Sequence, residues 1–437
     1  MKPLRAVLAI AVAAAVVPAR ADDLLQVYRD SLTSDPVYQS ARAQYQAAIE
    51  ALPQARAGYL PLIAGEASGF HNDLRFEAGP SIAYNTTTYA VTLSQPVFRL
   101  QNWLAIGEAK QQVVQAEAGL ASAGSDLILR VAQGYFDVLL AQDNVALSES
   151  QMAAISEQLA QAKRNFEVGT ATIVDTLEAQ ARYDQAAAQE ISDKNNLEVA
   201  RRALQQLLGK IPERLSPLKD PLLLAPPKPN DIEAWVRTAQ DSSFTVVSAK
   251  AADEIAREEV RRQEAGHLPT LDLTASYSKG YDPTIANAAI VGPRTDNSAV
   301  GLTLSVPFYS GGLVRSRVRQ AVANRDKADQ DLENTVRTVA QSVRQNYLNV
   351  TSGIAQVQAL ERALTSTQSQ LDSTILGRDV GVRTSVDVLN AQQQVYQTRR
   401  DLQQARYNYL LNGLRLKAAA GQLTETDVED VNRALAR

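Results

Sequence analysis

Two long stretches of this sequence carry apolar residues at every seventh position, and this spacing constrains the fold more than any other feature. The second half has six such residues in succession, at Val336, Val343, Val350, Val357, Leu364 and Leu371. The first half has the same stripe 212 residues earlier (343 − 131), at Val131, Val138, Val145, Met152 and Leu159. A heptad spacing of this length predicts long helices packed side by side rather than a globular core.

The stripes define two helices of unusual length. We expect them to start near Gln101 and Gly312 and to end at Gly169 and Gly381. About 65 residues at a helical rise give rods of about 100 Å, too long for a compact domain. A second heptad seam follows at Val388, Val395, Leu402, Tyr409 and Leu416. Small residues accompany this seam, so each rod should pair with a returning helix as an antiparallel hairpin, over about 101–208 and 312–420.

The two halves of the chain repeat each other. The stretch "FEVGTATIVDTLEAQ" from Phe166 returns as "RDVGVRTSVDVLNAQ" from Arg378, and "AGYLP" at Ala57 returns as "AGHLP" at Ala265. We therefore expect residues 22–210 and 231–421 to be tandem copies of one structural unit. Prolines crowd residues 211–230 and predict a linker, and residues 422–437 form a C-terminal tail.

The first residues indicate export. Residues 1–21 combine a basic start, an apolar run that is too short to span a bilayer, and the small-x-small site Ala19-Arg20-Ala21, as in a secretory signal peptide. The sequence contains no cysteine, so disulfides and a lipid on an N-terminal cysteine are both excluded. The net charge of −4 and the lack of a basic block give no case for nucleic acid.

Residues of alternating polarity precede each long helix and predict two strands per half. The expected ranges are about 60–72, 84–98, 268–280 and 296–309. Their length suits tilted transmembrane strands, although a soluble half-buried hairpin has the same periodicity. Four strands cannot close a barrel, because the smallest membrane barrels need eight. Several copies must then share one barrel, and this count alone does not choose between two, three and four copies.

The sequence resembles the TolC family of outer membrane exit ducts over essentially its whole length after residue 21. Five stretches carry the resemblance: "LLQVY" at Leu24, "HLPTLDLTAS" at His267, "VGLTLSVPFYSGGLV" at Val300, "VGVRTSVDVLNA" at Val380 and "ARYNYLLN" at Ala405. It implies an α+β membrane protein of a Gram-negative bacterium. As a homotrimer, it would form a 12-stranded β-barrel in outer membrane lipid, continuous with a 12-helix periplasmic α-barrel of coiled-coil hairpins.

The resemblance also implies the function and the partners. A duct of this family joins an inner-membrane translocase, of ABC or RND type, and a periplasmic adaptor to the exterior. The resemblance does not distinguish between two kinds of cargo, secreted proteins and small molecules such as drugs. An alternative from another class is a periplasmic coiled-coil adaptor or a structural protein of an export complex, which would also be exported, heptad-rich and oligomeric.

The repeated turn gives the first candidate site residues. Gly169 and Gly381 stand where each long helix must stop, as glycines that adopt the left-handed conformation. The pair Thr172 and Asp175 then has the spacing of a capping box, and Thr384 with Asp387 repeats it. Helix capping alone would account for the presence of both aspartates.

The resemblance gives several tip residues further roles at the periplasmic aperture. Asp387 matches the first of two acidic rings that close the entrance, and Asn390 occupies the position of the second ring. Arg383 matches a residue that ties the inner hairpin to the neighbouring tip, where Asp175 lies. Arg378 stands where the family has an aromatic latch, so closure is expected to differ there.

Enzymatic chemistry has little support. The two histidines, His71 and His267, flank expected strands, and no metal-hydrolase, nucleophile-elbow, dinucleotide or P-loop motif occurs. We therefore expect no catalytic residue, no cofactor and no metal site, and the energy for transport must come from the translocase.

Overall fold

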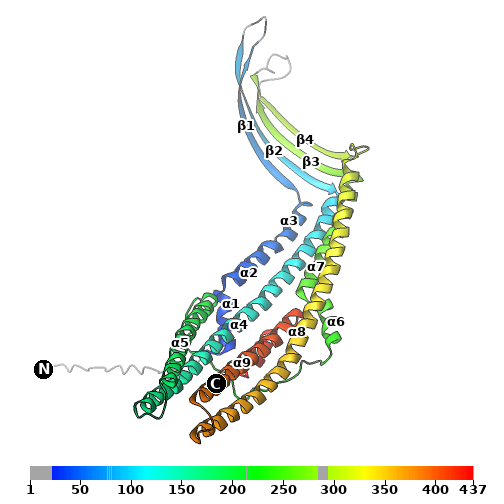
Figure 1. The fold of residues 1–437 in the computed structure, drawn as a ribbon. Coiled ribbons are helices and arrows are strands. Elements are labelled where there is room, and N and C mark those ends of the chain that lie inside the picture. Colours follow the sequence, from blue (N-terminus) through cyan, green and yellow to red (C-terminus); the bar gives the residue numbers. More distant parts are fainter. Residues whose placement is uncertain are drawn as a thin grey trace, which may run out of the picture.

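The computed structural model describes residues 22–75, 77, 79, 81–212, 214–283 and 294–436, so the expected signal peptide lies outside the described residues. The chain is elongated, with a four-stranded sheet at one end and two long helical hairpins at the other (Figure 1). The elements are α1 (Leu24–Ser34), α2 (Pro36–Ile49), α3 (Ala51–Ala57), β1 (Leu62–Leu74), β2 (Ile82–Phe98), α4 (Leu100–Glu167), α5 (Ile173–Leu208), α6 (Ile232–Ser242), α7 (Phe244–Glu264), the 3₁₀ turn η1 (Ala265–His267), β3 (Thr270–Tyr281), β4 (Arg294–Ser305), α8 (Leu313–Asp379), α9 (Ser385–Ala419) and α10 (Glu425–Asn432).

The last strand differs from the expected range of 296–309, since β4 spans Arg294–Ser305. Pro307 has no N–H to donate into a strand ladder, which explains the early end. Gly311 and Gly312 follow with φ values of 62° and 81°, a conformation that side chains disfavour. These glycines turn the chain from the sheet into α8.

The four strands form one antiparallel sheet in the order β1-β2-β3-β4. Ile63, Leu93, Ala275 and Val300 lie opposite one another and form a row across all four strands. The next row, on the other face, is Ala64, Thr92, Ser276 and Ala299. Because directly opposed residues share a face, the sheet has one apolar face and one face of small and polar residues.

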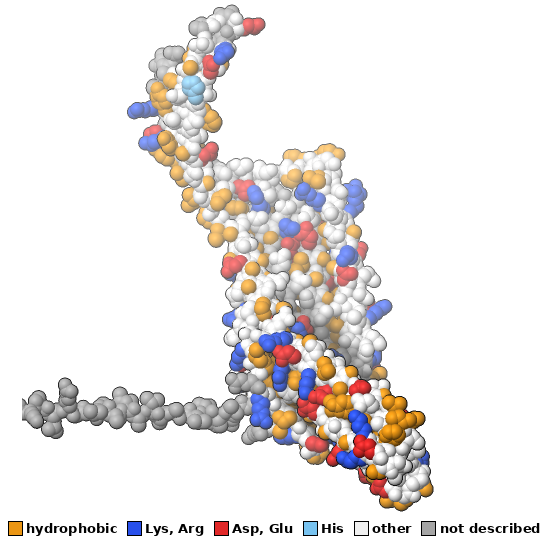
Figure 2. Space-filling view, turned by 60° about the vertical axis from the view of Figure 1, so that its left-hand side comes forward, with side chains coloured by type: hydrophobic (Ala, Val, Ile, Leu, Met, Phe, Trp, Pro, Cys, Tyr) orange, Lys and Arg blue, Asp and Glu red, His pale blue; other side chains and the backbone are white. Residues whose placement is uncertain are grey.

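The apolar face of the sheet is uncovered in the single chain. Val300, Leu302 and Leu304 of β4 are 78%, 66% and 64% exposed, and apolar side chains follow the length of the sheet in Figure 2. Within the described strands, β1 and β4 each pair on one side only, so both sheet edges are open. None of the described helices has the length and apolarity needed to cross a membrane.

The helical hairpins bury most of the heptad positions. In α8, Val343, Val350, Val357 and Leu371 are buried, and Val388, Val395, Leu402 and Leu416 are buried on the returning α9. In α4, Val131, Val138 and Leu159 are buried, whereas Val145 and Met152 are partly exposed. In the structure α4 packs against α5 and α8 packs against α9, each pair as an antiparallel hairpin.

The largest apolar core joins the first hairpin to the ends of the chain. It contains residues of α1, α4, α5, α9, α10 and the linker around Tyr135 and Phe136, which are almost fully buried. The Tyr135 hydroxyl donates to the backbone oxygen of Ser216 in the linker at 2.9 Å. Nearby, the buried carboxylate of Asp35 accepts two hydrogen bonds from Arg130, which lowers its pKa. This region, where α1, α10 and the linker pack against α4 and α9, is called the waist of the molecule here. Both halves of the sequence hold it together.

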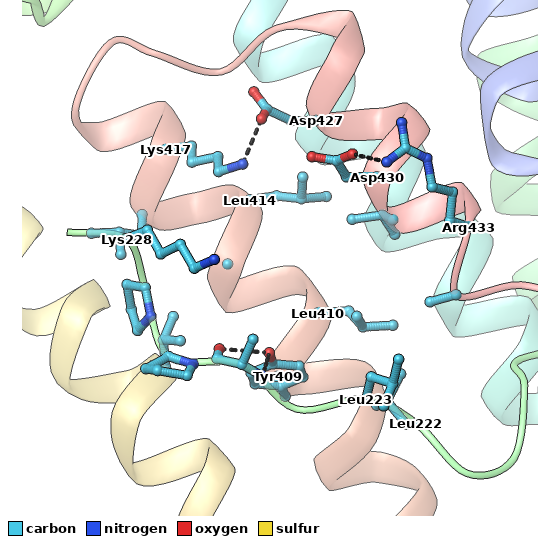
Figure 3. Close-up of a pocket in the computed structure, with 18 of the residues that line it drawn as sticks. Leu222, Leu223, Lys228, Tyr409, Leu410, Leu414, Lys417, Asp427, Asp430 and Arg433 are labelled. Carbon is cyan, nitrogen blue, oxygen red and sulfur yellow. Dashed lines mark hydrogen bonds and ion pairs between the residues drawn. The ribbon is translucent and has the colours of Figure 1, made fainter. Parts of the chain in front are cut away.

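A cavity of about 590 Å³ lies between the linker, α9 and α10 at this waist (Figure 3). Leu222, Leu410 and Leu414 line it, and the ion pair of Lys417 with Asp427, 2.5 Å long, stands beside it. The Tyr409 hydroxyl donates to the backbone oxygen of Ala225 and accepts a hydrogen bond from the backbone N–H of Ala225. These contacts fix the proline-rich linker against the returning helix of the second hairpin.

Two glutamates share one arginine where α4 and α7 run side by side. Arg262 Nε of α7 donates to Glu108 Oε1 of α4 at 2.9 Å and to Glu259 Oε2 at 2.7 Å. Burial, followed by the neighbouring Glu259 carboxylate, raises the pKa of Glu108 to about 7, although Arg262 opposes the shift. Near neutral pH this cluster is therefore close to gaining or losing a proton.

We expect Glu108→Gln to flatten the dependence of thermal stability on pH. The folded chain raises the Glu108 pKa from 4.5 to about 7. The proton held by Glu108 therefore stabilises the fold fully below about pH 4.5, and this stability is lost as the pH rises through about 7. The melting temperature of the detergent-solubilised protein should fall between pH 5 and pH 8 more steeply in the wild type than in the variant. The matched control is Glu117→Gln, at an exposed position on the same helix. Equal slopes for the wild type and Glu108→Gln would contradict this assignment.

Candidate functional site at the hairpin tips

Both long hairpins turn at the same end of the molecule (Figure 1). In the first, Gly169 has φ 78° and Thr170 N–H donates to Asn165 O at 2.8 Å. In the second, Gly381 has φ 80° and Val382 N–H donates to Gly377 O at 2.9 Å. The two turns therefore close in the same way, and each needs a glycine because side chains disfavour positive φ.

Both capping boxes are present after the turns. Asp175 Oδ2 accepts from the backbone N–H of Thr172 at 2.9 Å, and Thr172 Oγ1 accepts from the Asp175 N–H at 3.3 Å. Asp387 and Thr384 make the corresponding bonds at 2.9 Å and 3.1 Å. Each box satisfies backbone donors that a helix start leaves unpaired.

The same contacts keep the two tip aspartates ionised. Hydrogen bonds from the Thr172 hydroxyl and backbone lower the pKa of Asp175. The Thr384 backbone and hydroxyl lower the pKa of Asp387, and the nearby Arg383 charge adds to this effect. Both carboxylates therefore carry a negative charge throughout the neutral pH range.

The two tip arginines of the second hairpin lie differently. Arg378 forms an ion pair with the adjacent Asp379 at 2.8 Å. Arg383 packs over Gly377, where an added Cβ would come within 2.7 Å of the Arg383 Cγ. The described residues of the single chain contain no ion pair between Arg383 and Asp175, and Asp175 instead bonds to Thr172. A link between these two residues thus requires a neighbouring copy or a rearrangement of the tips.

One contact at the tips is not predicted by any sequence pattern. Arg182 of α5 donates from Nη2 to Asn390 Oδ1 at 3.0 Å and from Nη1 to Gln393 Oε1 at 3.1 Å. Asn390 and Gln393 are three residues apart on α9, so both point toward the same neighbour. The contact ties the first hairpin to the second beside Asp387. The sequence holds no signal for it, because its partners lie more than 200 residues away from Arg182.

The tips also expose large apolar side chains. Those at least 60% exposed are Val168, Val174, Leu177, Leu376, Val380 and Val382. The space-filling view shows apolar side chains interspersed with charges at this lower end (Figure 2). Exposed apolar residues gathered beside charged ones are typical of an interaction surface. Among the described residues, no cluster of His, Cys, Asp or Glu has the makings of a metal site.

Comparisons with known proteins agree with this architecture. The family model described as "Outer membrane efflux protein" matches residues 27–210 and again residues 235–422. The outer membrane protein TolC of Vibrio cholerae is 34% identical over 415 residues, covering 95% of this chain and 94% of that protein. The alkaline protease secretion protein AprF of Pseudomonas aeruginosa is 31% identical, covering 93% and 86%.

The fold is also found among solved structures. A crystal structure of CusC, described in terms of transmembrane channel formation, superposes with a TM-score of 0.79 at 18% sequence identity. The superposition covers 92% of this chain and 92% of that one. At this identity the likeness concerns the fold.

Proposed function

Because the chain belongs to the outer membrane efflux protein family, we propose that three copies assemble into one continuous tube. The protein is an outer membrane exit duct of a Gram-negative bacterium, and it extends into the periplasm. Its family is one of transport proteins rather than enzymes. Because the family matches both halves of the chain, the alternative of a periplasmic adaptor is set aside.

The open sheet is the observation that carries the proposal. Its apolar face is exposed and both of its edges lack partners within the described strands. In lipid, an open edge leaves backbone groups unsatisfied, so the sheet must close with copies of itself. Two copies would supply eight strands and three would supply twelve. The family resemblance favours three, with the apolar face toward lipid and the polar face toward the lumen.

The hairpins continue the tube into the periplasm. Each chain has two hairpins, so three chains supply twelve helices. The longest helix, α4, has 68 residues, or about 100 Å of length. We propose that the two halves are tandem repeats, residues 22–210 and 231–421, joined by the linker at the waist. Three-fold symmetry then turns each tip side chain into a ring of three around the entrance.

The tip residues would form the gate of this tube. We propose that Asp387 supplies an acidic ring at the aperture and that Asn390 supplies a neutral one. A ring of carboxylates favours cations and repels anions. Arg383 of one copy would pair with Asp175 at a neighbouring tip, as a charge-assisted contact that holds the entrance shut.

The partners follow from the same arrangement. We propose that the exposed apolar residues of the tips receive the helical hairpins of a periplasmic adaptor, which dock in grooves between the duct hairpins. An inner-membrane translocase of ABC or RND type would supply the energy. The duct would then export proteins, small molecules or both.

We expect the charge at the two ring positions to control ion selectivity. Asp387→Asn should lower the cation-to-anion permeability ratio of the purified protein in planar bilayers, and Asn390→Asp should raise it. Asn at position 387 keeps an oxygen that can cap α9, so the change tests charge rather than folding. Glu425→Gln, at the distant start of α10, is the control. If the reversal potential is the same in all variants, neither residue lines the aperture.

We expect the double variant Arg383→Ser with Asp175→Ser to conduct more than the wild type. Removing both partners of the contact between copies releases the tips without leaving an unpaired charge. Single-channel recording in planar bilayers measures the conductance directly. An unchanged conductance would remove this pair from the gate.

A further inference from the structure

The two hairpins of one chain meet along a seam whose packing changes abruptly at Arg400 of α9. On the side toward the waist, α9 enters the main core through Tyr407, Leu411 and Leu414. The Tyr407 hydroxyl donates to Asp143 Oδ2 of α4 at 2.8 Å, and its ring lies 5.7 Å from that of Phe136. This part of the seam is closely packed around an apolar core.

On the side toward the tips the seam is hollow and polar. A cavity of about 260 Å³ lies between α4, α5 and α9, and half of its lining residues are glutamines: Gln151, Gln185, Gln189, Gln392, Gln393 and Gln397. The buried Oε1 of Gln392 has no hydrogen-bond partner. Among the described residues, the contacts across this stretch include a small apolar cluster, in which Leu389 packs with Ile155 and Ala186, and the Arg182 hydrogen bonds at the lower end. Opening this stretch therefore disrupts few strong interactions.

Arg400 stands at the boundary and bonds to both helices of the first hairpin. Its Nη2 donates to both carboxylate oxygens of Asp193 on α5, at 2.7 and 2.8 Å, and its Nε donates to Asn144 Oδ1 on α4 at 3.3 Å. Asp193 is only 3% exposed and also accepts from Gln189 at 2.9 Å. Charge-assisted contacts of this burial are hard to break, because separation leaves a charge without a partner.

The pair also departs from the sequence repeat. At the spacing of 212 residues, Arg400 corresponds to Ala188 (400 − 212) and Asp193 to Ala405 (193 + 212). Each half thus has one member of the pair where the other half has alanine. Two hairpins whose long helices and turns match in sequence are thereby joined in one specific register.

We propose that Arg400 is a positioning residue for the entrance. Together with Asp193, Arg400 would fix the point along α9 on whose tip side the two hairpins can separate. About 22 Å of helix lies between Arg400 and the start of α9 at Ser385. Movement of the tips is confined to this stretch, and the packed seam above stays closed. The gating part of this proposal rests on the proposed duct function, whereas the anchoring of α9 does not.

Hydrogen exchange of the detergent-solubilised full-length protein tests the anchor. In Arg400→Gln and in Asp193→Asn we expect about tenfold faster exchange over residues 385–399, with the sheet unchanged. The double variant Arg400→Asp with Asp193→Arg should restore slow exchange by reversing the pair. Arg337→Gln, which removes an exposed ion pair with Glu333 on α8, is the control and should have no effect.

Single-channel conductance of the same variants tests the positioning role. We expect Arg400→Gln to raise conductance at an unchanged oligomeric state, and the reversed pair to return it toward the wild-type value. The proposal is overturned if hydrogen exchange is unchanged in Arg400→Gln and Asp193→Asn. It is also overturned if exchange accelerates equally on the waist side and on the tip side of Arg400. If the wild type does not conduct, the duct function fails, while the exchange data still decide whether Arg400 anchors α9.

Discussion

An apolar sheet face that its own chain leaves uncovered, between two unpaired edges, is the constraint on which the rest of this structure depends. Among the described elements, no helix packs on the row formed by Ile63, Leu93, Ala275 and Val300, and the sheet edges at β1 and β4 leave backbone groups available. In the proposed assembly, lipid would cover the face and neighbouring copies would pair with the edges. Copies arranged around one axis would also bring the hairpins attached to the sheet side by side.

Along the hairpins, the strength of the contacts decreases from waist to tip. The waist holds the largest apolar core, where the linker and the tail meet α4 and α9. Below Arg400, the seam between hairpins contains a glutamine-rich cavity, one small apolar cluster around Leu389 and exposed hydrogen bonds. A rigid upper tube with a loosely joined lower end suits a duct that stays sealed across the periplasm and opens at its entrance.

Local patterns in the sequence predicted a large part of this architecture. The heptad spacing indicated both long helices and the returning helix of the second half, and the repeat extended this pattern to the first half. The Thr172 and Thr384 capping boxes indicated where the returning helices start, because each box is formed by residues close together in the sequence. The end of β4 was placed four residues too late, since alternation continues past Ser305 whereas backbone pairing does not. Arg182, Arg400 and the Glu108 cluster were missed because their partners are more than 150 residues away in the sequence. Such contacts depend on how whole helices align, which no local pattern records.

The central claim is that several copies close one barrel around a common pore. The most direct test combines the mass of the detergent-solubilised protein, from native mass spectrometry, with current recordings after its insertion into a planar bilayer. The account requires a particle of three chains that conducts ions. A water-soluble single chain that is stable without detergent and gives no current would contradict it.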